Sequence, residues 1–354
     1  MKELTAPAVY TGGRAGGCFV AVSTTGPESS ASPGAPDRPT ARPLPTDRFK
    51  RGPLQADRMP TAERLRGEPV AAGVRADVRD RLRELDERGT TPTLATVLMS
   101  DDPAAERFVD LKHAACRDLD VASRDVRIDP GAPAERLHRA IDRLCADPAV
   151  DGVFVQVPLP DHVALASVRR RLDPATDVDC LSFVNLGRLV RGDPRYLPAT
   201  PAAVRRLLTA YDVPIAGEDV TIVGRSTIVG KPLANLLLEE CPDGNATVTV
   251  CHSRTPDLGA VTRRADVVVT AAGVPGLVNG SMLSRGVTVV DVSANDVASA
   301  NGGETEVVGD VDFESAASVA GSITPVPGGV GPVTLAMLVS NVVWAAERRA
   351  DAEG

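Results

Sequence analysis

The spacing of apolar residues divides the chain into helical and extended segments from about residue 62 onward. Between Ala62 and Glu87, apolar residues recur every three or four positions among many Arg and Asp residues, which predicts an amphipathic helix. The same spacing predicts further helices at 102–119, 134–145, 202–211, 230–240 and 331–349. Short continuous apolar runs predict buried strands at 93–98, 125–128, 151–157, 219–223, 247–251, 266–271 and 287–292.

These strands and helices alternate in two successive series, which meet near residue 200. Such alternation is typical of βαβ units and of mostly parallel sheets. A length of 354 residues also suggests two domains, each able to bury its own core. The last helix has Pro332 in its first turn and is expected to pack back on the first series. We therefore predict an α/β protein with one domain formed by 58–198 together with 325–350, a second formed by 199–324, and a cleft between them.

Residues 1–57 show neither the helical nor the strand pattern of apolar residues, and they are rich in Pro, Gly, Ser and Thr. A segment of this kind cannot bury enough apolar surface to offset its ordering entropy, so we predict a disordered extension. Met59 lies where the patterned sequence begins, and our hypothesis is that it is an alternative start and that residues 1–58 are dispensable. The apolar run around Cys18 is too short and too interrupted by glycine for a signal peptide.

Charge and cysteine content exclude several classes of protein. A net charge of −8 leaves no broad positive surface for nonspecific nucleic-acid binding. No apolar run reaches 18 residues, so we expect no membrane span. The six cysteines are scattered, without a C-x-x-C pair or a His at zinc spacing, which indicates reduced thiols, a cytoplasmic protein and no metal site. Only four of the 39 basic Lys and Arg side chains are lysines: Lys2, Lys50, Lys112 and Lys231.

A strand, a glycine-bearing turn and a helix follow one another at 223–232, with the sequence VGRSTIVGKP. In such a unit, backbone N–H groups and the helix dipole face a bound phosphate, which indicates dinucleotide binding. The spacing from Gly224 to Gly230 is G-x-x-x-x-x-G rather than G-x-G-x-x-G, so a tight turn without a ligand is the alternative interpretation.

The next strand ends in Cys251, His252, Ser253 and Arg254, without the carboxylate that would hold the ribose 2′-hydroxyl of NAD. A hydroxyl and a guanidinium, together with Arg225, suit the 2′-phosphate of NADP. The sequence therefore favours NADP over NAD. The alternative is that Arg254 is one of many solvated arginines.

Lys112 lies one helical turn after Phe108, and Cys116 continues the same face. An amine beside apolar surface has a lowered pKa and can act as a base or proton relay near neutral pH. The alternative is a surface lysine whose stem crosses an apolar face.

Two further polar residues accompany this lysine. Gln156 sits in an apolar strand that two prolines end, and a buried amide must be paired by protein or by ligand. The segment Asp177-Val178-Asp179 offers a carboxylate that could pair with a flat donor edge such as that of a pterin. Taken singly, each of these features also has a structural interpretation.

In this order, the segments resemble the bifunctional methylenetetrahydrofolate dehydrogenase/cyclohydrolase family, the FolD-type enzymes. The resemblance covers roughly residues 62–349. It is carried by segments 151–160, 177–179 with 185–189, 223–236, 247–255 and 323–337.

The resemblance implies a two-domain fold: a catalytic folate-binding domain, and a Rossmann-like NADP-binding domain at 199–324. It implies NADP-dependent oxidation of 5,10-methylenetetrahydrofolate to the 5,10-methenyl form, and hydrolysis of that form to 10-formyltetrahydrofolate. The family's essential lysine falls on Lys112, its glutamine on Gln156 and its pterin-binding carboxylate on Asp179. Phe108 would stack on the substrate.

The resemblance also implies the cofactor site and the assembly. Arg225, Ser226, Ser253 and Arg254 match the cofactor-phosphate region, together with Gly224 and Gly230 of the turn. Pro327, Gly328 and Gly329 match the loop that closes over folate and cofactor. Family members form homodimers, so a homodimer is expected.

Four positions depart from the family pattern. Phe108 replaces the usual tyrosine, Cys180 and Ser293 replace glycines, and Ala199 replaces a cysteine. Two alternatives therefore stay open beside the bifunctional enzyme. One is a monofunctional or pathway-specialised paralogue with weakened cyclohydrolase activity, and the other is a catalytically silent relative that binds folate or NADP.

Overall fold

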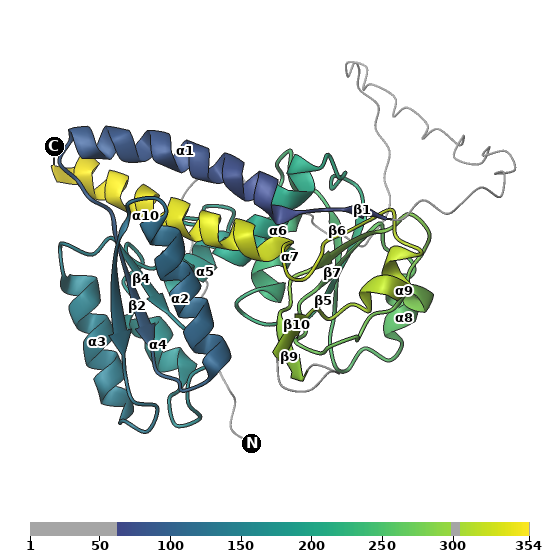
Figure 1. Ribbon diagram of the computed structural model, residues 1–354, viewed down its shortest axis with the longest axis horizontal. Helices are drawn as coiled ribbons and strands as arrows, with labels where there is room; N and C mark the ends of the chain where they lie inside the picture. Colours follow the sequence, from purple (N-terminus) through teal and green to yellow (C-terminus); the bar gives the residue numbers. More distant parts are fainter. Residues whose placement is uncertain (1–61, 299–304, 354) are drawn as a thin grey trace, which may run out of the picture. The chain divides into compact units, whose positions relative to one another are not determined.

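The computed structural model describes residues 62–298 and 305–353 (Figure 1). The predicted extension at 1–57 and the hypothesis about Met59 lie outside the described residues. Within the described residues the strands form two parallel sheets and one antiparallel hairpin. The fold is therefore α/β, as the alternating pattern predicts.

The first sheet has three parallel strands in the order β3-β2-β4. Its strands are β2 (Thr93–Leu98), β3 (Ala122–Arg127) and β4 (Gly152–Val155), connected through α2 (Pro103–Arg117) and α3 (Ala134–Ala146). All six residues of β2 are buried, because a central strand of a parallel sheet is covered on both faces. This burial explains why β2 contains only aliphatic residues and two threonines, without a charged side chain.

The second sheet has six strands in the order β1-β11-β8-β7-β5-β6, and all of its pairs are parallel. The chain runs from β5 to β6 on one side and then returns to β7 on the other side of β5. This reversal makes the carboxyl ends of β5 and β7 a topological switch point, where ligands bind in open α/β sheets. The strands are β1 (Glu63–Arg64), β5 (Asp219–Val223), β6 (Thr247–Cys251), β7 (Val267–Thr270), β8 (Thr288–Asp291) and β11 (Ser322–Ile323).

Three helices pack together beside the sheets: α1 (Gly67–Glu87), α6 (Ala199–Ala210) and α10 (Val330–Glu353) (Figure 1). Arg81 of α1 holds Glu347 of α10 through two hydrogen bonds of 2.7 and 2.8 Å. Arg349 donates to Asp151, beside β4, at 2.8 Å. The last helix therefore packs back on the first series of elements, as predicted, and it also contacts α6.

The stretch Val330–Ala352 of α10 is long enough to cross a membrane and contains an 18-residue window with a mean hydropathy of 1.4. It is the one such stretch among the described residues, and 56% of that window is buried inside the protein. Its contacts with α1 and α6 identify it as a core helix.

The predicted helix at 62–87 begins too early. Glu63 and Arg64 form β1, which pairs in parallel with β11 at the edge of the second sheet, and the helix starts only at Gly67. Several short elements escape the periodicity because each spans eight residues or fewer. They are α4 (Leu165–Arg171), α5 (Phe183–Val190), α8 (Leu258–Thr262), α9 (Phe313–Ala317), η1 (Gly280–Met282) and the hairpin of β9 (Asn295–Ala298) with β10 (Thr305–Val308). The remaining helix, α7 (Gly230–Leu238), begins where predicted.

Candidate functional site

Lys112 projects from α2 into a polar contact with the first sheet. The helix begins after Asp102, whose side chain accepts a hydrogen bond from the Ala104 N–H at 3.0 Å. The Lys112 Nζ donates to the backbone oxygen of Phe108 at 3.1 Å and to the Gln156 Oε1 at 3.2 Å. The helix therefore brings the predicted lysine and glutamine into direct contact.

Aromatic rings surround the same amine. The Lys112 Nζ lies 4.4 Å from the centroid of the Phe154 ring and 5.9 Å from that of Phe108. Burial lowers the pKa of Lys112 to about 8, while the nearby Asp179 carboxylate acts in the opposite direction. Near neutral pH the amine can therefore exchange a proton.

The Gln156 side chain has a fixed orientation. Its backbone N–H donates to Val97 O at 2.9 Å, which continues the pairing with β2 beyond the end of β4. Its Nε2 donates to Val157 O at 2.8 Å, so Oε1 is the atom that faces Lys112. Phe154 lies two residues earlier, on the same face of the strand. Strand alternation could have identified Phe154 from the sequence, but our sequence interpretation missed it.

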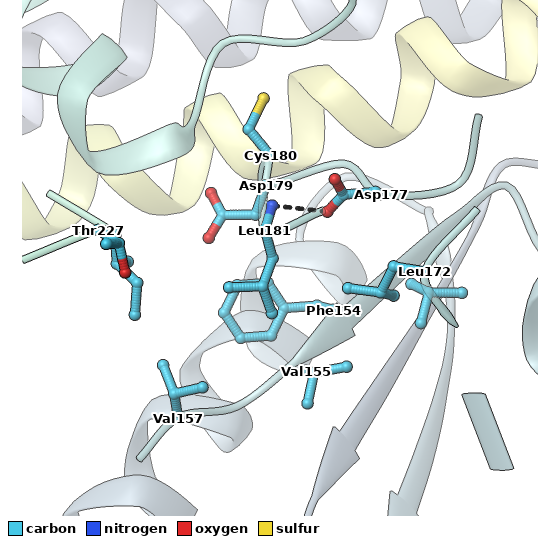
Figure 2. Close-up of a pocket in the computed structure, with 11 residues that line it drawn as sticks. Phe154, Val155, Val157, Leu172, Asp177, Asp179, Cys180, Leu181 and Thr227 are labelled. Carbon is cyan, nitrogen blue, oxygen red and sulfur yellow. Dashed lines mark hydrogen bonds between the residues drawn. The ribbon is translucent and has the colours of Figure 1, made fainter. Parts of the chain in front are cut away.

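Asp179 lies at a small cavity of about 40 Å³ (Figure 2). One of its oxygens accepts the Ala199 N–H at 2.7 Å, and its other oxygen accepts no hydrogen bond from residues 62–298 or 305–353. Burial raises the pKa of Asp179 to about 6. Since Ala199 uses only its backbone here, the replacement of the family's cysteine leaves this contact intact.

The neighbouring Asp177 has a structural role instead. It is 1% exposed and accepts hydrogen bonds from Leu181 N, Ser182 N and the Asn185 Nδ2, at 2.8 to 2.9 Å. Figure 2 shows the bond from Leu181 to Asp177 on one side of the cavity and Asp179 on another. Of the two carboxylates, Asp179 is therefore the one available to a ligand.

Cys180 occupies a backbone position that favours glycine. Its φ is +55°, in the left-handed region, which costs a non-glycine residue about 1–2 kcal/mol. The thiol is buried and donates to Tyr196 O at 2.7 Å. Burial raises the pKa of this thiol, so it stays protonated and inert. The cysteine that replaces the family's glycine is therefore a structural residue.

The turn after β5 lies at the switch point of the second sheet. A Cβ on Gly224 would stand 2.2 Å from Ala271 O, and a Cβ on Gly230 would stand 2.2 Å from Gly224 O. Both positions therefore require glycine, because two backbone segments approach each other closely. Protein backbone accounts for both glycines, so this close approach fits a tight turn as well as a dinucleotide-binding turn.

One expectation about this turn is wrong. The sequence pattern predicts that N–H groups at the start of α7 face a bound phosphate, but three of the N–H groups there already donate to Ser226. Its Oγ accepts the N–H groups of Val229 and Gly230 at 3.0 and 3.3 Å, and its backbone oxygen accepts that of Lys231 at 2.9 Å. The Ser226 hydroxyl donates no hydrogen bond within the described part of the chain.

The strand ends bring the predicted cofactor residues together. Gly224 N donates to Cys251 O at 2.9 Å, so the turn with Arg225 lies beside the segment with Ser253 and Arg254. All three of these side chains are exposed. Neither guanidinium has a carboxylate partner in the described part of the chain. Two uncompensated cations beside a dinucleotide-type turn fit a phosphate group.

The loop with Pro327, Gly328 and Gly329 lies between β11 and α10. Gly328 O accepts the N–H of Gly67, the first residue of α1, at 2.8 Å. None of the hydrogen bonds among the described residues joins this loop to Lys112 or to the turn at 224–230. Lys112, Gln156, Phe108 and Asp179 thus form one group and the turn residues a second, and no hydrogen bond among the described residues links the loop to either group.

The cavity connects the first two groups. Thr227 and Ile228 of the turn line it together with Asp179 (Figure 2). Arg169 of α4, which is 8% exposed, donates to the Thr227 Oγ1 at 2.5 Å. Sequence reasoning missed Arg169 because one arginine among many carries no signal.

Two family models match the chain. The model described as "Tetrahydrofolate dehydrogenase/cyclohydrolase, catalytic domain" matches residues 65–179. The model described as "Tetrahydrofolate dehydrogenase/cyclohydrolase, NAD(P)-binding domain" matches residues 198–350. The first range contains Lys112, Gln156 and Asp179, and the second contains the turn at 224–230.

Individual relatives agree with these models. The bifunctional protein FolD of Haloquadratum walsbyi is 52% identical over 279 residues, which cover 79% of this chain and 89% of the relative. The FolD protein of Natronomonas pharaonis is also 52% identical, over 82% of this chain and 97% of its own. A structure of the Trypanosoma brucei methylenetetrahydrofolate dehydrogenase-cyclohydrolase, complexed with NADP cofactor and inhibitor, has a TM-score of 0.77 at 36% identity and covers 82% of this chain and 99% of its own. The chain belongs to the tetrahydrofolate dehydrogenase/cyclohydrolase family.

Proposed function

We propose that this protein oxidises 5,10-methylenetetrahydrofolate to 5,10-methenyltetrahydrofolate with NADP⁺ and hydrolyses the product to 10-formyltetrahydrofolate. The observation that carries the proposal is the Lys112 amine, which contacts Gln156 and the Phe154 ring within the range that matches the family's catalytic domain. The open oxygen of Asp179 supports folate binding in the same place.

The second domain fits a dinucleotide. Gly224 and Gly230 allow the backbone to approach closely at the switch point, and Arg225, Ser253 and Arg254 stand exposed beside it. When bound there, NADP supplies the acceptor for the hydride. The two guanidinium groups would hold the 2′-phosphate, and Ser226 and Ser253 would donate hydroxyl hydrogen bonds to phosphate oxygens.

The first domain carries the proton chemistry of the hydrolysis. As water attacks the methenyl carbon, the free amine of Lys112 accepts a proton from that water. The resulting ammonium stays paired with the Gln156 Oε1 and can donate to the folate nitrogen as its bond to carbon breaks. Asp179 would hold the pterin ring so that the carbon lies near the amine.

The division of labour in the chain is also a proposal. We assign the catalytic folate-binding domain to 58–198 with 325–350 and the NADP-binding domain to 199–324. The contacts of α10 with α1 support its placement in the first domain, although α10 also contacts α6.

We further propose a cytoplasmic homodimer. The outer edge of β6 pairs with no strand in the described part of the chain, so it is open to a second copy. Light scattering on the purified protein would measure the subunit number.

The deciding experiment is an assay that follows methenyl and 10-formyl formation separately, with NADP⁺ and with NAD⁺. Wild-type protein should produce NADPH from methylenetetrahydrofolate, and absence of NADPH would overturn the dehydrogenase assignment. Lys112→Met should abolish methenyl hydrolysis while folate binding stays measurable. Lys112→Arg is the matched variant, because it keeps the charge but cannot release a proton, and it should be equally inactive in hydrolysis.

The silent relative and the specialised paralogue remain distinguishable in these assays. A silent relative would bind NADP⁺ in calorimetry and show no turnover of either kind. A paralogue with weakened cyclohydrolase activity would form methenyltetrahydrofolate and accumulate it. The missing hydroxyl at Phe108 is the observation that favours the second of these alternatives.

A further inference from the structure

A buried carboxylate in the second domain holds three consecutive backbone N–H groups. Asp310, which follows β10, is 0% exposed. Its Oδ2 accepts the N–H groups of Ala272 and Gly273 at 2.6 and 3.1 Å, and its Oδ1 accepts that of Val274 at 2.7 Å. One side chain thus fixes the whole start of the loop after β7.

Two side chains from the segment after β8 complete the coordination of Asp310. The Ser293 Oγ donates to Oδ2 at 2.7 Å, and the Asn295 Nδ2 donates to Oδ1 at 3.0 Å. All five partners are donors, so Asp310 acts only as an acceptor. Ser293 stands where the family usually has glycine, and here it adds one bond to the same carboxylate.

The loop that Asp310 holds borders the proposed cofactor site. Gly224, the first residue of the dinucleotide turn, packs against the backbone of Ala271 so closely that a Cβ would stand 2.2 Å from its oxygen. Val223 and Thr270 are register partners at the ends of β5 and β7. The loop at 271–274 therefore begins at the switch point, in contact with the turn.

The order of the strands identifies the half of the cofactor that the loop would face. Ser253 and Arg254, the proposed 2′-phosphate residues, follow β6 on one side of β5, whereas the loop follows β7 on the other side. The turn after β5 lies between them, where the pyrophosphate of a bound dinucleotide is expected. The loop at 272–274 therefore lies toward the nicotinamide half.

We propose that Asp310 is a positioning residue for the dehydrogenase step. It holds the backbone of the loop at 272–274 in one conformation, in which the loop faces the nicotinamide half of NADP. Ser293 and Asn295 hold the Asp310 carboxylate in place through their hydrogen bonds. The proposal rests on the proposed function, since it assumes that NADP binds at the switch point. It assigns Asp310 no contact with the cofactor or the substrate.

The test is Asp310→Asn in the full-length protein. Asparagine has nearly the size of aspartate, but its amide NH₂ group would face backbone N–H groups that need an acceptor. We expect kcat/KM for NADP⁺ in the dehydrogenase assay to fall about tenfold to a hundredfold, as for a displaced positioning loop. Hydrolysis of supplied methenyltetrahydrofolate needs no NADP and should stay within about twofold of wild type. A purely structural residue would lower both activities together.

The matched control is the double variant Ser293→Ala with Asn295→Ala, which removes both supports but leaves the three backbone bonds. It should lower kcat/KM for NADP⁺ by a smaller factor than Asp310→Asn, again without loss of hydrolysis, and it keeps the test decisive if Asp310→Asn does not fold. An unchanged kcat/KM for NADP⁺ in the variant that folds, or a parallel loss of both activities, would overturn the proposal. Wild-type protein without NADPH formation would instead overturn the proposed function.

Discussion

At the scale of single residues, the behaviour of Lys112 depends on two opposing surroundings. The apolar contacts of its amine lower the pKa to about 8, and the Asp179 carboxylate limits that decrease. Only the free amine can accept a proton from water. We therefore expect the rate of methenyl hydrolysis to rise with pH and to level off above about pH 8.

Asp179→Asn removes the negative charge that keeps the pKa of Lys112 from falling further. The rising part of the pH profile should then move to lower pH, together with a higher KM for folate. The measurement is kcat/KM for methenyl hydrolysis against pH, after subtraction of the rate of Lys112→Met at each pH. An unshifted profile in Asp179→Asn would contradict the electrostatic coupling.

Phe108→Tyr tests the departure from the family one turn before the lysine. The added hydroxyl would reach the region of the amine from a ring that already lies 5.9 Å from it. We expect the hydrolytic rate to rise severalfold while the dehydrogenase rate stays the same. Phe108→Leu is the control, because it removes the ring and should weaken folate binding. An unchanged rate in Phe108→Tyr would mean that the hydroxyl has no role here.

The residue scale also shows where sequence reasoning ends. The contact between Lys112 and Gln156 was predictable only through the family resemblance, because each residue taken singly also has a structural interpretation. The hydrogen bonds that Ser226 and Asp310 accept from backbone N–H groups could not be predicted, because the identity of a residue does not show which backbone group it contacts. The same holds for Arg169, whose partner Thr227 lies far away in the chain.

At the scale of elements, three strands were predictable to the residue. The limits of β2, β5 and β6 agree with the predicted ranges 93–98, 219–223 and 247–251. Apolar runs bounded by polar or turn residues define such strands locally. The two-residue strands β1 and β11 exist only through pairing between distant segments, so a local pattern cannot reveal them.

Two glycines of α1 give a matched test of the contact between this helix and the loop at 327–329. A Cβ on Gly67 would stand 1.8 Å from Gly329 O, whereas nothing lies within 4 Å of a Cβ on Gly73. Gly67→Ala should therefore displace the loop, raise the KM for folate and destabilise the fold. Gly73→Ala should stabilise it by about 0.5–1 kcal/mol.

Urea denaturation and substrate titration of both variants measure these effects. Equal stabilities and equal KM values for the two variants would contradict the close approach at Gly67. A raised KM in Gly67→Ala alone would support a role for the loop in folate binding.

At the scale of the whole molecule, Asn341 of α10 joins two remote segments near the proposed folate site. Its Nδ2 donates to Val178 O and to Leu197 O, both at 2.8 Å. These carbonyls precede Asp179 and Ala199 closely in the chain. Asn341→Leu keeps the volume but leaves both carbonyls without a donor, so we expect a loss of about 2–4 kcal/mol in stability and a higher KM for folate.

The control is Thr334→Val on the same helix, where the hydroxyl bonds only to Val330 O within the helix. It should cost less than about 1 kcal/mol, measured by denaturant unfolding of both variants. Equal losses in the two variants would show that Asn341 makes no special contribution.

The packing of α10 also constrains the order in which the protein can mature. A ribosome makes β2, β3 and β4 early, yet the helix that covers α1 and reaches Asp151 beside β4 emerges last. Until then the apolar face of α1 has no neighbour in α10, and the nascent chain exposes a surface suited to chaperone capture. A stop codon anywhere before α10 would therefore leave this face of α1 uncovered.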